Sequence, residues 1–128
     1  MKKLFLFIIS VCIVMSLCSC SVVLSDKSQP VELVFHYNES SVDAQLTEQD
    51  SKAVYEMFDG KELYFDEPSC GFDENISLRI NGRAYCPACD SCCTVKDCGS
   101  GMYFTISQSE RNTIERIFRK HGGYFPCV

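Results

Sequence analysis

The chain lacks most of the residues and motifs on which enzyme active sites depend. It has no tryptophan and only two histidines, His36 and His121, which lie far apart in the sequence. It contains no Gly-rich phosphate loop and no arrangement typical of a Ser-His-Asp triad, and its paired acidic residues are sequence neighbours whose side chains diverge. These absences argue against catalysis, and we expect a non-enzymatic protein.

Positive charge is also scarce. The chain has 12 lysines and arginines against 17 aspartates and glutamates, which gives a formal net charge of −5. An acidic surface repels both the phosphate backbone of nucleic acids and anionic lipid headgroups. We therefore expect no nucleic-acid partner, whereas a protein partner of unknown identity stays open.

Long hydrophobic runs are absent after residue 17. Residues 4–17 are nearly all apolar and follow the positive pair Lys2 and Lys3. This run is shorter than the roughly 20 residues that span a bilayer, and it has the length of the h-region of a secretory signal. We therefore predict a helical signal peptide over residues 1–19.

The end of this signal predicts a lipid anchor. Leu17-Cys18-Ser19-Cys20 resembles the lipobox of bacterial lipoproteins of the signal peptidase II class, although Cys18 replaces the usual Ala, Ser or Thr. The resemblance implies that Cys20 becomes the first mature residue, carries covalent lipid and anchors the protein on the extracytoplasmic face of the cell membrane. Cleavage near Ser19 by an ordinary signal peptidase and an uncleaved N-terminal anchor are the alternatives.

Loss of Lys2 and Lys3 with the signal takes the net charge from −5 to −7. Attachment to the membrane would then rest on the acyl chains, since each buried methylene contributes about 0.8 kcal/mol.

The first half of the mature chain reads as a tether followed by a strand and a helix. The Ser-rich stretch 20–30 ends in Pro30 and predicts a tether, so we place a single domain over 31–128. Apolar residues alternate over 31–37, which predicts a strand, and 38–43 has the composition of a loop. Thr47 suits a helix N-cap and Gly60 a helix end, so we expect a helix between them.

The second half predicts further strands and a second helix. Alternation over 76–80 and 83–86 flanks Asn81-Gly82, the strongest short signal for a β-hairpin. Further strands are predicted over 62–65 and 101–106, and Ser107 and Glu110 form a capping box that opens a helix ending at 122–123. The fold class is therefore α+β: a small antiparallel sheet with two helices packed on one face and a cysteine-rich loop.

Cysteine is the residue that the chain has in excess, at ten positions. Two of them fall in the signal and Cys20 is the lipid site. The seven disulfide candidates are Cys70, Cys86, Cys89, Cys92, Cys93, Cys98 and Cys127. Dense cysteine in a small exported domain indicates disulfides, but seven is odd and the sequence does not give the connectivity.

Two details bear on the pairing. Cys92 and Cys93 are adjacent, so their side chains point apart and need different partners. Cys93 with Cys98 would close a short loop, and Cys127 with a distant cysteine such as Cys70 would close a long one.

Zinc binding and thiol redox chemistry are the alternatives to disulfides. Cys86, Cys89, Cys92 or Cys93, and Cys98 could form a four-thiolate zinc site, although they lie in one run and not in two separated knuckles. The Cys-x2-Cys-x2-Cys spacing also opens a ferredoxin motif, but Lys96 stands where the fourth ligand belongs. Cys86 and Cys89 resemble a thioredoxin-type redox pair, but no amphipathic helix follows them.

Four further stretches carry a resemblance: "SCGFDENISL", "YCPACD", "YFTIS" and "GGYFPC". They resemble small exported cysteine-rich lipoproteins of Gram-positive gut bacteria over most of 47–128. The resemblance implies an extracytoplasmic location and assigns no activity or catalytic residue. The sequence thus predicts a lipid-anchored, disulfide-stapled domain that acts as a non-enzymatic binding or structural accessory, without a cofactor unless the zinc alternative holds.

Overall fold

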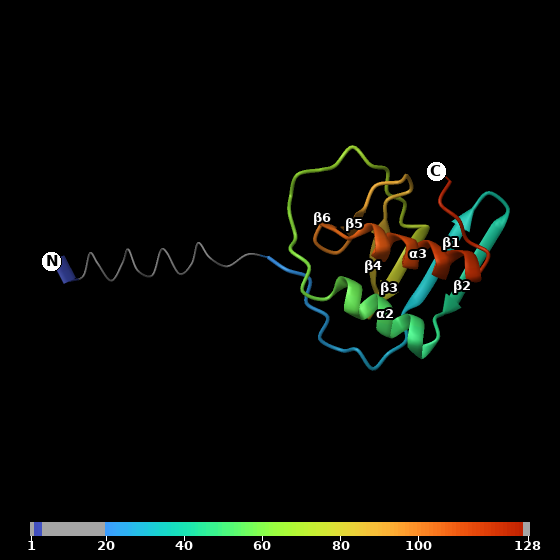
Figure 1. The fold of residues 1–128 in the computed structure, drawn as a ribbon, viewed down its shortest axis with the longest axis horizontal. Coiled ribbons are helices and arrows are strands. Elements are labelled where there is room, and N and C mark those ends of the chain that lie inside the picture. The colour runs from blue at the N-terminus through green and yellow to red at the C-terminus, as the bar shows by residue number, and fades with distance from the viewer. Residues whose placement is uncertain (1, 4–19, 127–128) are drawn as a thin grey trace.

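The fold is an antiparallel sheet covered by two helices, as the sequence predicts for the α+β class (Figure 1). The computed structural model describes residues 2–3 and 20–126, so nearly all of the predicted signal helix lies outside the described residues. The six strands lie in the order β2-β1-β3-β4-β5-β6, and every neighbouring pair is antiparallel. Along the chain the elements are β1 (Glu32–Tyr37), β2 (Ser40–Gln45), α2 (Glu48–Phe58), β3 (Ile76–Ile80), β4 (Arg83–Pro87), β5 (Thr94–Asp97), β6 (Met102–Thr105) and α3 (Gln108–Lys120).

Both helices lie on the same side of the sheet, and the hydrophobic core fills the space between them (Figure 1). Leu78 and Phe104 from the sheet are fully buried together with Phe58 of α2 and Phe118 of α3. Their burial removes apolar surface from water at about 25 cal/mol per Å². This layer fixes α3 against the sheet, whose strands β4 and β5 flank the cysteine-rich loop.

The predicted helix and turn signals are confirmed. Thr47 caps α2 by accepting a hydrogen bond from the Asp50 amide, and Gly60 adopts a φ of 79° just beyond the helix. Ser107 opens α3 with a complete capping box. The hairpin between β3 and β4 turns at Asn81 and Gly82, whose φ angles are 52° and 78°, as this type of turn requires.

Two strands were not predicted. The stretch 38–43 reads as a loop, yet β2 begins at Ser40 after a tight turn in which Asn38 has a φ of 54°. β2 is an edge strand in which only Val42 and Ala44 alternate with polar residues, so its sequence shows too short a pattern to predict a strand. β5 lies within the predicted cysteine-rich loop, and its four residues are too few to show a period of two.

The prediction of a tether over 20–30 is wrong for its first residues. Val22 and Leu24 are buried, and the Val22 amide donates to the Lys61 carbonyl at 2.8 Å. The predicted strand 62–65 is reduced to two isolated bridges, of which one pairs Ser21 with Glu62 and the other pairs Tyr64 with Tyr103. The Ser-rich composition of 20–30 concealed these contacts, and residues 20–22 are bonded to the segment 60–63.

Candidate functional site

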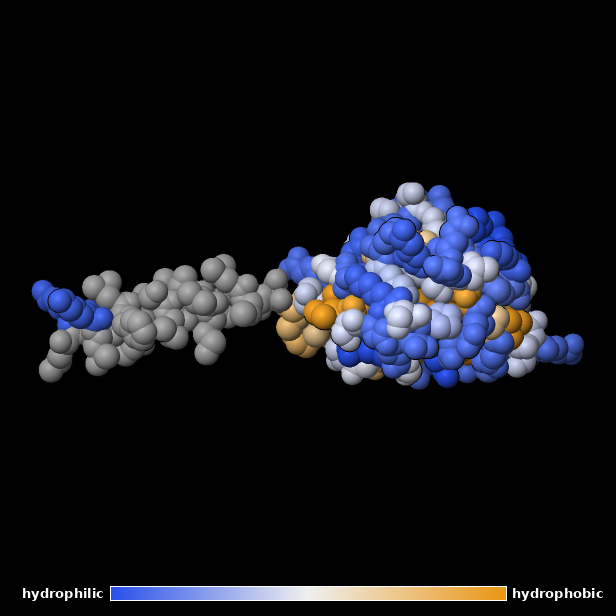
Figure 2. Space-filling model, turned by 90° about the horizontal axis from the view of Figure 1, so that it is seen from below, coloured by the Kyte–Doolittle hydropathy of each residue, from blue (hydrophilic) through white to orange (hydrophobic). Residues whose placement is uncertain are grey.

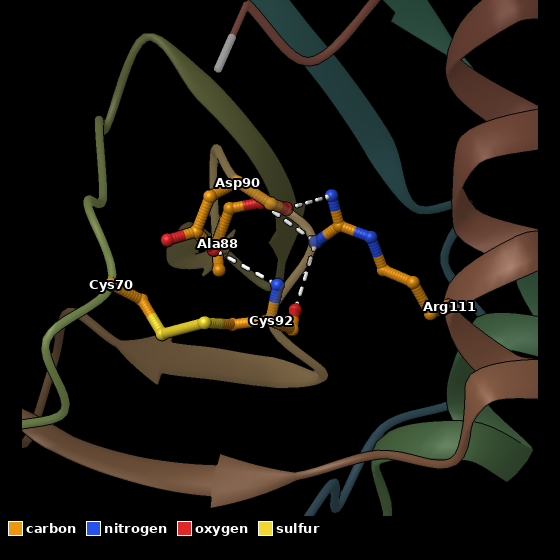
Figure 3. The surroundings of a disulfide bond; sticks show 5 residues. All are labelled: Cys70, Ala88, Asp90, Cys92 and Arg111. Carbon is orange, nitrogen blue, oxygen red and sulfur yellow. Dashed lines mark hydrogen bonds between the residues drawn. A yellow bond between two sulfur atoms is a disulfide. The ribbon is translucent and has the colours of Figure 1, made fainter. Parts of the chain in front are cut away.

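The cysteine-rich segment is held by one disulfide among the described residues. Cys70 and Cys92 are bonded, with Cα atoms 6.4 Å apart (Figure 3). Cys70 lies in the long connection between α2 and β3, and Cys92 lies in the loop between β4 and β5. The bond therefore joins two loops that have no regular secondary structure at these points. The pairing of Cys70 with Cys127 that the sequence left open is thereby excluded.

The loop 88–93 is also fixed by its own backbone. Asp90 accepts a hydrogen bond from the Cys92 amide at 2.9 Å, which is the geometry of an Asx turn. The Cys89 amide donates to the Gly71 carbonyl at 2.8 Å, directly beside the disulfide. Cys89 itself is buried in the hydrophobic core.

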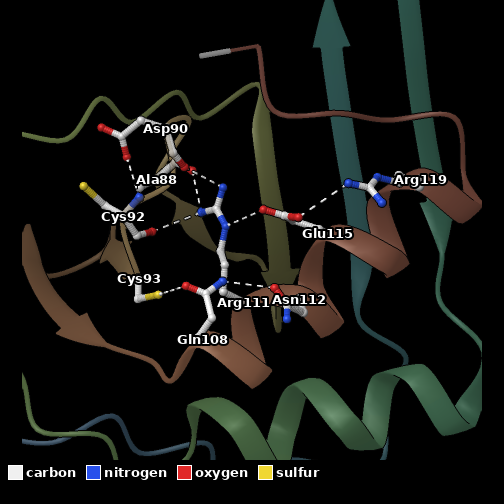
Figure 4. A network of polar contacts seen from close by, with 9 residues as sticks. All are labelled: Ala88, Asp90, Cys92, Cys93, Gln108, Arg111, Asn112, Glu115 and Arg119. Carbon is white, nitrogen blue, oxygen red and sulfur yellow. Dashed lines mark hydrogen bonds and ion pairs between the residues drawn. The ribbon is translucent and has the colours of Figure 1, made fainter. Parts of the chain in front are cut away.

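Arg111 of α3 is the central residue of this site (Figure 4). Its side chain is 1% exposed, and its guanidinium donates to the backbone carbonyls of Ala88 at 2.7 Å, Asp90 at 2.6 Å and Cys92 at 3.3 Å. Its Nε also pairs with Glu115 at 3.1 Å. Burial of a charge is costly unless it is paired and hydrogen-bonded, and here each of the three guanidinium nitrogens has a partner.

The guanidinium of Arg111 also lies 4.3 Å from the centre of the Phe125 ring, a cation–π distance. One buried cation thus connects the cysteine loop, helix α3 and the C-terminal segment. The sequence analysis missed this residue. The available signal was its position three residues before Ile114 and seven before Phe118, which places it on the apolar stripe of the helix.

A second cysteine pair lies on the face of the sheet opposite the helices. Tyr85 points into the core, so its neighbour Cys86 points to the other face, where its sulfur is 2.9 Å from that of Cys98. The contact with Cys98, together with burial, raises the pKa of the Cys86 thiol. The hydrogen bond from Cys86 lowers the pKa of Cys98, because it stabilises the Cys98 thiolate. The predicted alternative of a Cys93–Cys98 bond is not present.

Asp97 fixes the turn next to Cys98. Its side chain is 2% exposed, and Arg83 donates to it twice, at 2.6 and 2.5 Å. The Gly99 amide and the Ser100 hydroxyl add bonds of 3.0 Å each. Burial raises the pKa of this carboxyl, but the Arg83 and Ser100 hydrogen bonds outweigh it and the pKa is lowered.

The structure does not assemble the predicted zinc site. Cys92 is bonded to Cys70, and Cys86 contacts Cys98, so the sulfurs of Cys86, Cys89, Cys92 and Cys98 do not converge in the part of the chain that the structure describes. One group of possible metal ligands does converge there, namely Cys70, Asp90 and Cys92. Two of its three members are sulfurs of the disulfide, and these lack the thiolate form that binds metal.

The geometry does not match a thioredoxin-type pair either. Cys86 lies in β4, whereas helices α2 and α3 begin at Glu48 and Gln108, so neither helix places its N-terminus at this thiol. Cys86 is fully buried, and its raised pKa disfavours the nucleophilic thiolate at neutral pH.

The remaining predicted site residues are dispersed. Cys20 is exposed, and its carbonyl accepts from the Leu63 amide at 2.9 Å. Cys93 is half-buried, and its thiol donates to Gln108 at 3.5 Å. Cys127 lies outside the described residues.

Comparison of the chain with protein-family models, with curated proteins and with solved structures found no match. Among the described residues, neither helix is both long enough and apolar enough to cross a bilayer.

Proposed function

We propose that the protein is a lipid-anchored accessory domain on the extracytoplasmic face of the membrane, in which the cysteines are structural. The observation that carries this proposal is the arrangement around Arg111. The residue holds three carbonyls of the loop that the Cys70–Cys92 bond ties down. A loop held from both sides is suited to structural support, not to repeated opening and closing.

The position of Cys20 supports the lipid anchor. Its side chain is exposed, so attachment of a lipid to its sulfur needs no unfolding of the domain. Two or three acyl chains on one cysteine would hold the protein firmly, because single chains bind only marginally. The acidic surface would keep the rest of the domain away from anionic headgroups.

The contact between Cys86 and Cys98 supports a second staple in the exported protein. The sulfurs are 2.9 Å apart, and a disulfide needs about 2.05 Å. Closure would remove two protons and two electrons, which pass to an extracytoplasmic disulfide oxidase by thiol–disulfide exchange. The product would tie β4 to the turn after β5 on the face away from the helices.

The mass of the exported protein tests these assignments together. We expect lipid on Cys20 and peptides that link Cys70 to Cys92 and Cys86 to Cys98 when the digest is not reduced. A Cys20→Ser variant is the matched control, because it should lose the lipid and keep both linked peptides.

Three outcomes would contradict the proposal. A mature protein without lipid would remove the membrane anchor. Free thiols at Cys86 and Cys98 together with the mass of a bound zinc ion would make this a metal protein. Free thiols that oxidise and reduce reversibly would favour the redox alternative.

A further inference from the structure

Exposed hydrophobic side chains are few on this domain, and two of them lie beside the predicted lipid site. In the described part of the chain, the large hydrophobic residues with exposed side chains are Val23 and Phe65, each 76% exposed, and Tyr124, 42% exposed. Val23 lies three residues after Cys20. Phe65 lies two residues after Leu63, whose amide is bonded to the Cys20 carbonyl at 2.9 Å.

The third residue lies elsewhere. The Tyr124 ring packs 5.1 Å from Phe35 and 5.8 Å from Tyr37, on β1. Strand β1 and the point at which residue 20 meets the domain lie at opposite ends of the molecule (Figure 1). Figure 2 shows hydrophobic surface at the end that carries residue 20.

The backbone next to Cys20 is held close to the domain. The bridge from Ser21 to Glu62 and the burial of Val22 fix the backbone immediately after Cys20. A lipid on Cys20 would therefore bring the surrounding surface to the bilayer at short range, because three residues span at most about 10 Å. A long tether would instead lower the effective concentration of this surface at the membrane and so weaken any contact between them.

We propose that Val23 and Phe65 insert into the interfacial region of the bilayer on either side of the Cys20 anchor, so that the domain sits on the membrane in one fixed orientation. This inference rests on the proposed function, since it needs the lipid on Cys20. The occupant of the patch is the lipid surface itself. Tyr124, β1 and β2 then point away from the membrane and face the surroundings.

The neighbouring charges limit how deep the insertion goes. Asp66 and Glu67 directly follow Phe65, and both are exposed. Carboxylates stay in the headgroup layer and are repelled by anionic lipid, so the contact is shallow and prefers zwitterionic membranes. Phe65 reaches the acyl boundary while the two carboxylates next to it stay in the hydrated headgroup layer.

Tryptophan fluorescence tests the orientation, because the native chain contains no tryptophan. The exported, lipidated protein with Phe65→Trp is placed in phosphatidylcholine vesicles, with and without bromine on the acyl chains. A side chain held about 5 to 10 Å into the boundary should show a blue-shifted emission, and bromine on the acyl chains should quench this emission. Val23→Trp should behave alike, and Tyr124→Trp, the control, should not respond.

The outcomes separate this inference from the proposed function. Lipid on Cys20 by mass, with the Phe65→Trp and Val23→Trp proteins as unresponsive as the Tyr124→Trp control, would overturn the fixed orientation and leave the anchor intact. A blue shift without quenching by bromine would assign the patch to a second copy of the chain and would also overturn it. Absence of lipid on Cys20 would be a failure of the proposed function itself. Equal unfolding midpoints for the three variants exclude misfolding as the cause.

Discussion

The two halves of the sheet are stabilised in different ways. In the half formed by β1, β2, α2 and β3, the strands carry regularly spaced apolar residues, and Leu33, Phe35, Ile76 and Leu78 are fully buried. The half formed by β4, β5 and β6 contains the loop 88–93, in which the buried side chains are the small residues Ala88 and Cys89. Within this loop the chain is held by the Cys70–Cys92 bond and by Arg111, whereas the strands around it also bury apolar residues such as Val95 and Phe104.

The difference shows how a small exported domain compensates for a limited core. About a hundred residues bury a smaller share of their surface than a large domain does, so loops cannot all be held by apolar packing. Apolar burial suffices where the strands are long and regular. Where the chain must turn within a few residues, a covalent bond and a buried cation supply the fixed points.

The half formed by β4, β5 and β6 is called the cross-linked half below. The largest effect should come from removing Arg111, its buried cation. Arg111→Ala would leave the carbonyls of Ala88 and Asp90 without this donor, and Glu115 would keep only its exposed pairing with Arg119. We expect a loss of about 3 to 5 kcal/mol in the free energy of unfolding, as for a broken buried ion pair. Urea unfolding of the oxidised protein measures it.

Arg119→Ala is the matched control for this substitution. Its side chain is 74% exposed and pairs with the same Glu115, at 3.6 Å, so its loss should cost about 0.5 kcal/mol or less. Similar losses in the free energy of unfolding for the two variants would mean that the disulfide alone holds the loop. Arg111 would then not be one of the features that distinguish the two halves.

A somewhat smaller effect is expected from the disulfide. Cys70→Ser combined with Cys92→Ser opens a loop with a sequence separation of 22, which corresponds to about 3 kcal/mol in the chain-entropy treatment. Hydrogen exchange should then increase in the loops around residues 70 and 92 more than in β1 and β3. Uniform acceleration across all strands would show instead that the two halves open as one unit. Cys93→Ser is the control, because this half-buried thiol is not part of the disulfide and its hydrogen bond to Gln108 is long, at 3.5 Å.

The same comparison explains what the sequence could reveal. The main elements of the half formed by β1, β2, α2 and β3 were predicted, because helix caps such as Thr47 and the alternation of apolar residues are local signals. β2 escaped because its alternation is limited to Val42 and Ala44, which is too short a pattern to mark a strand. In the cross-linked half, the hairpin at Asn81-Gly82 was predicted from its turn residues alone.

The cross-links themselves could not be predicted. Seven candidate cysteines allow many pairings, and the choice of Cys70 for Cys92 depends on which loops the fold brings together. The role of Arg111 likewise depends on carbonyls some twenty residues earlier in the chain. Its place on an apolar stripe marked it as unusual, but only the fold shows that a loop surrounds it.

The smallest effects are expected at two carboxylates, one in each half. Asp97 is buried among four donors in the cross-linked half. Asp50 joins α2 to Lys120 at 2.9 Å and to Arg116 at 3.5 Å in the other. We expect Asp97→Asn to cost about 2 kcal/mol at pH 7, because an amide places a donor among donors. Asp50→Asn should cost about 1 kcal/mol or less, because both of its partners are about half exposed and screened by solvent.

The pH dependence of stability tests whether these two carboxylates are linked to folding. Hydrogen bonds from Arg83 and Ser100 outweigh burial and lower the pKa of Asp97, and the hydrogen bond from Lys120 lowers that of Asp50. A carboxyl whose pKa is lowered by folding contributes stability above its unfolded pKa of about 3.9, and this contribution is lost as the pH falls through the folded value. The wild type should therefore lose more stability between pH 5 and pH 2 than Asp97→Asn does, with Asp50→Asn in between. Parallel curves for all three proteins in urea unfolding across this range would mean that neither carboxylate is linked to folding, and that the cross-linked half depends on Arg111 and the disulfide alone.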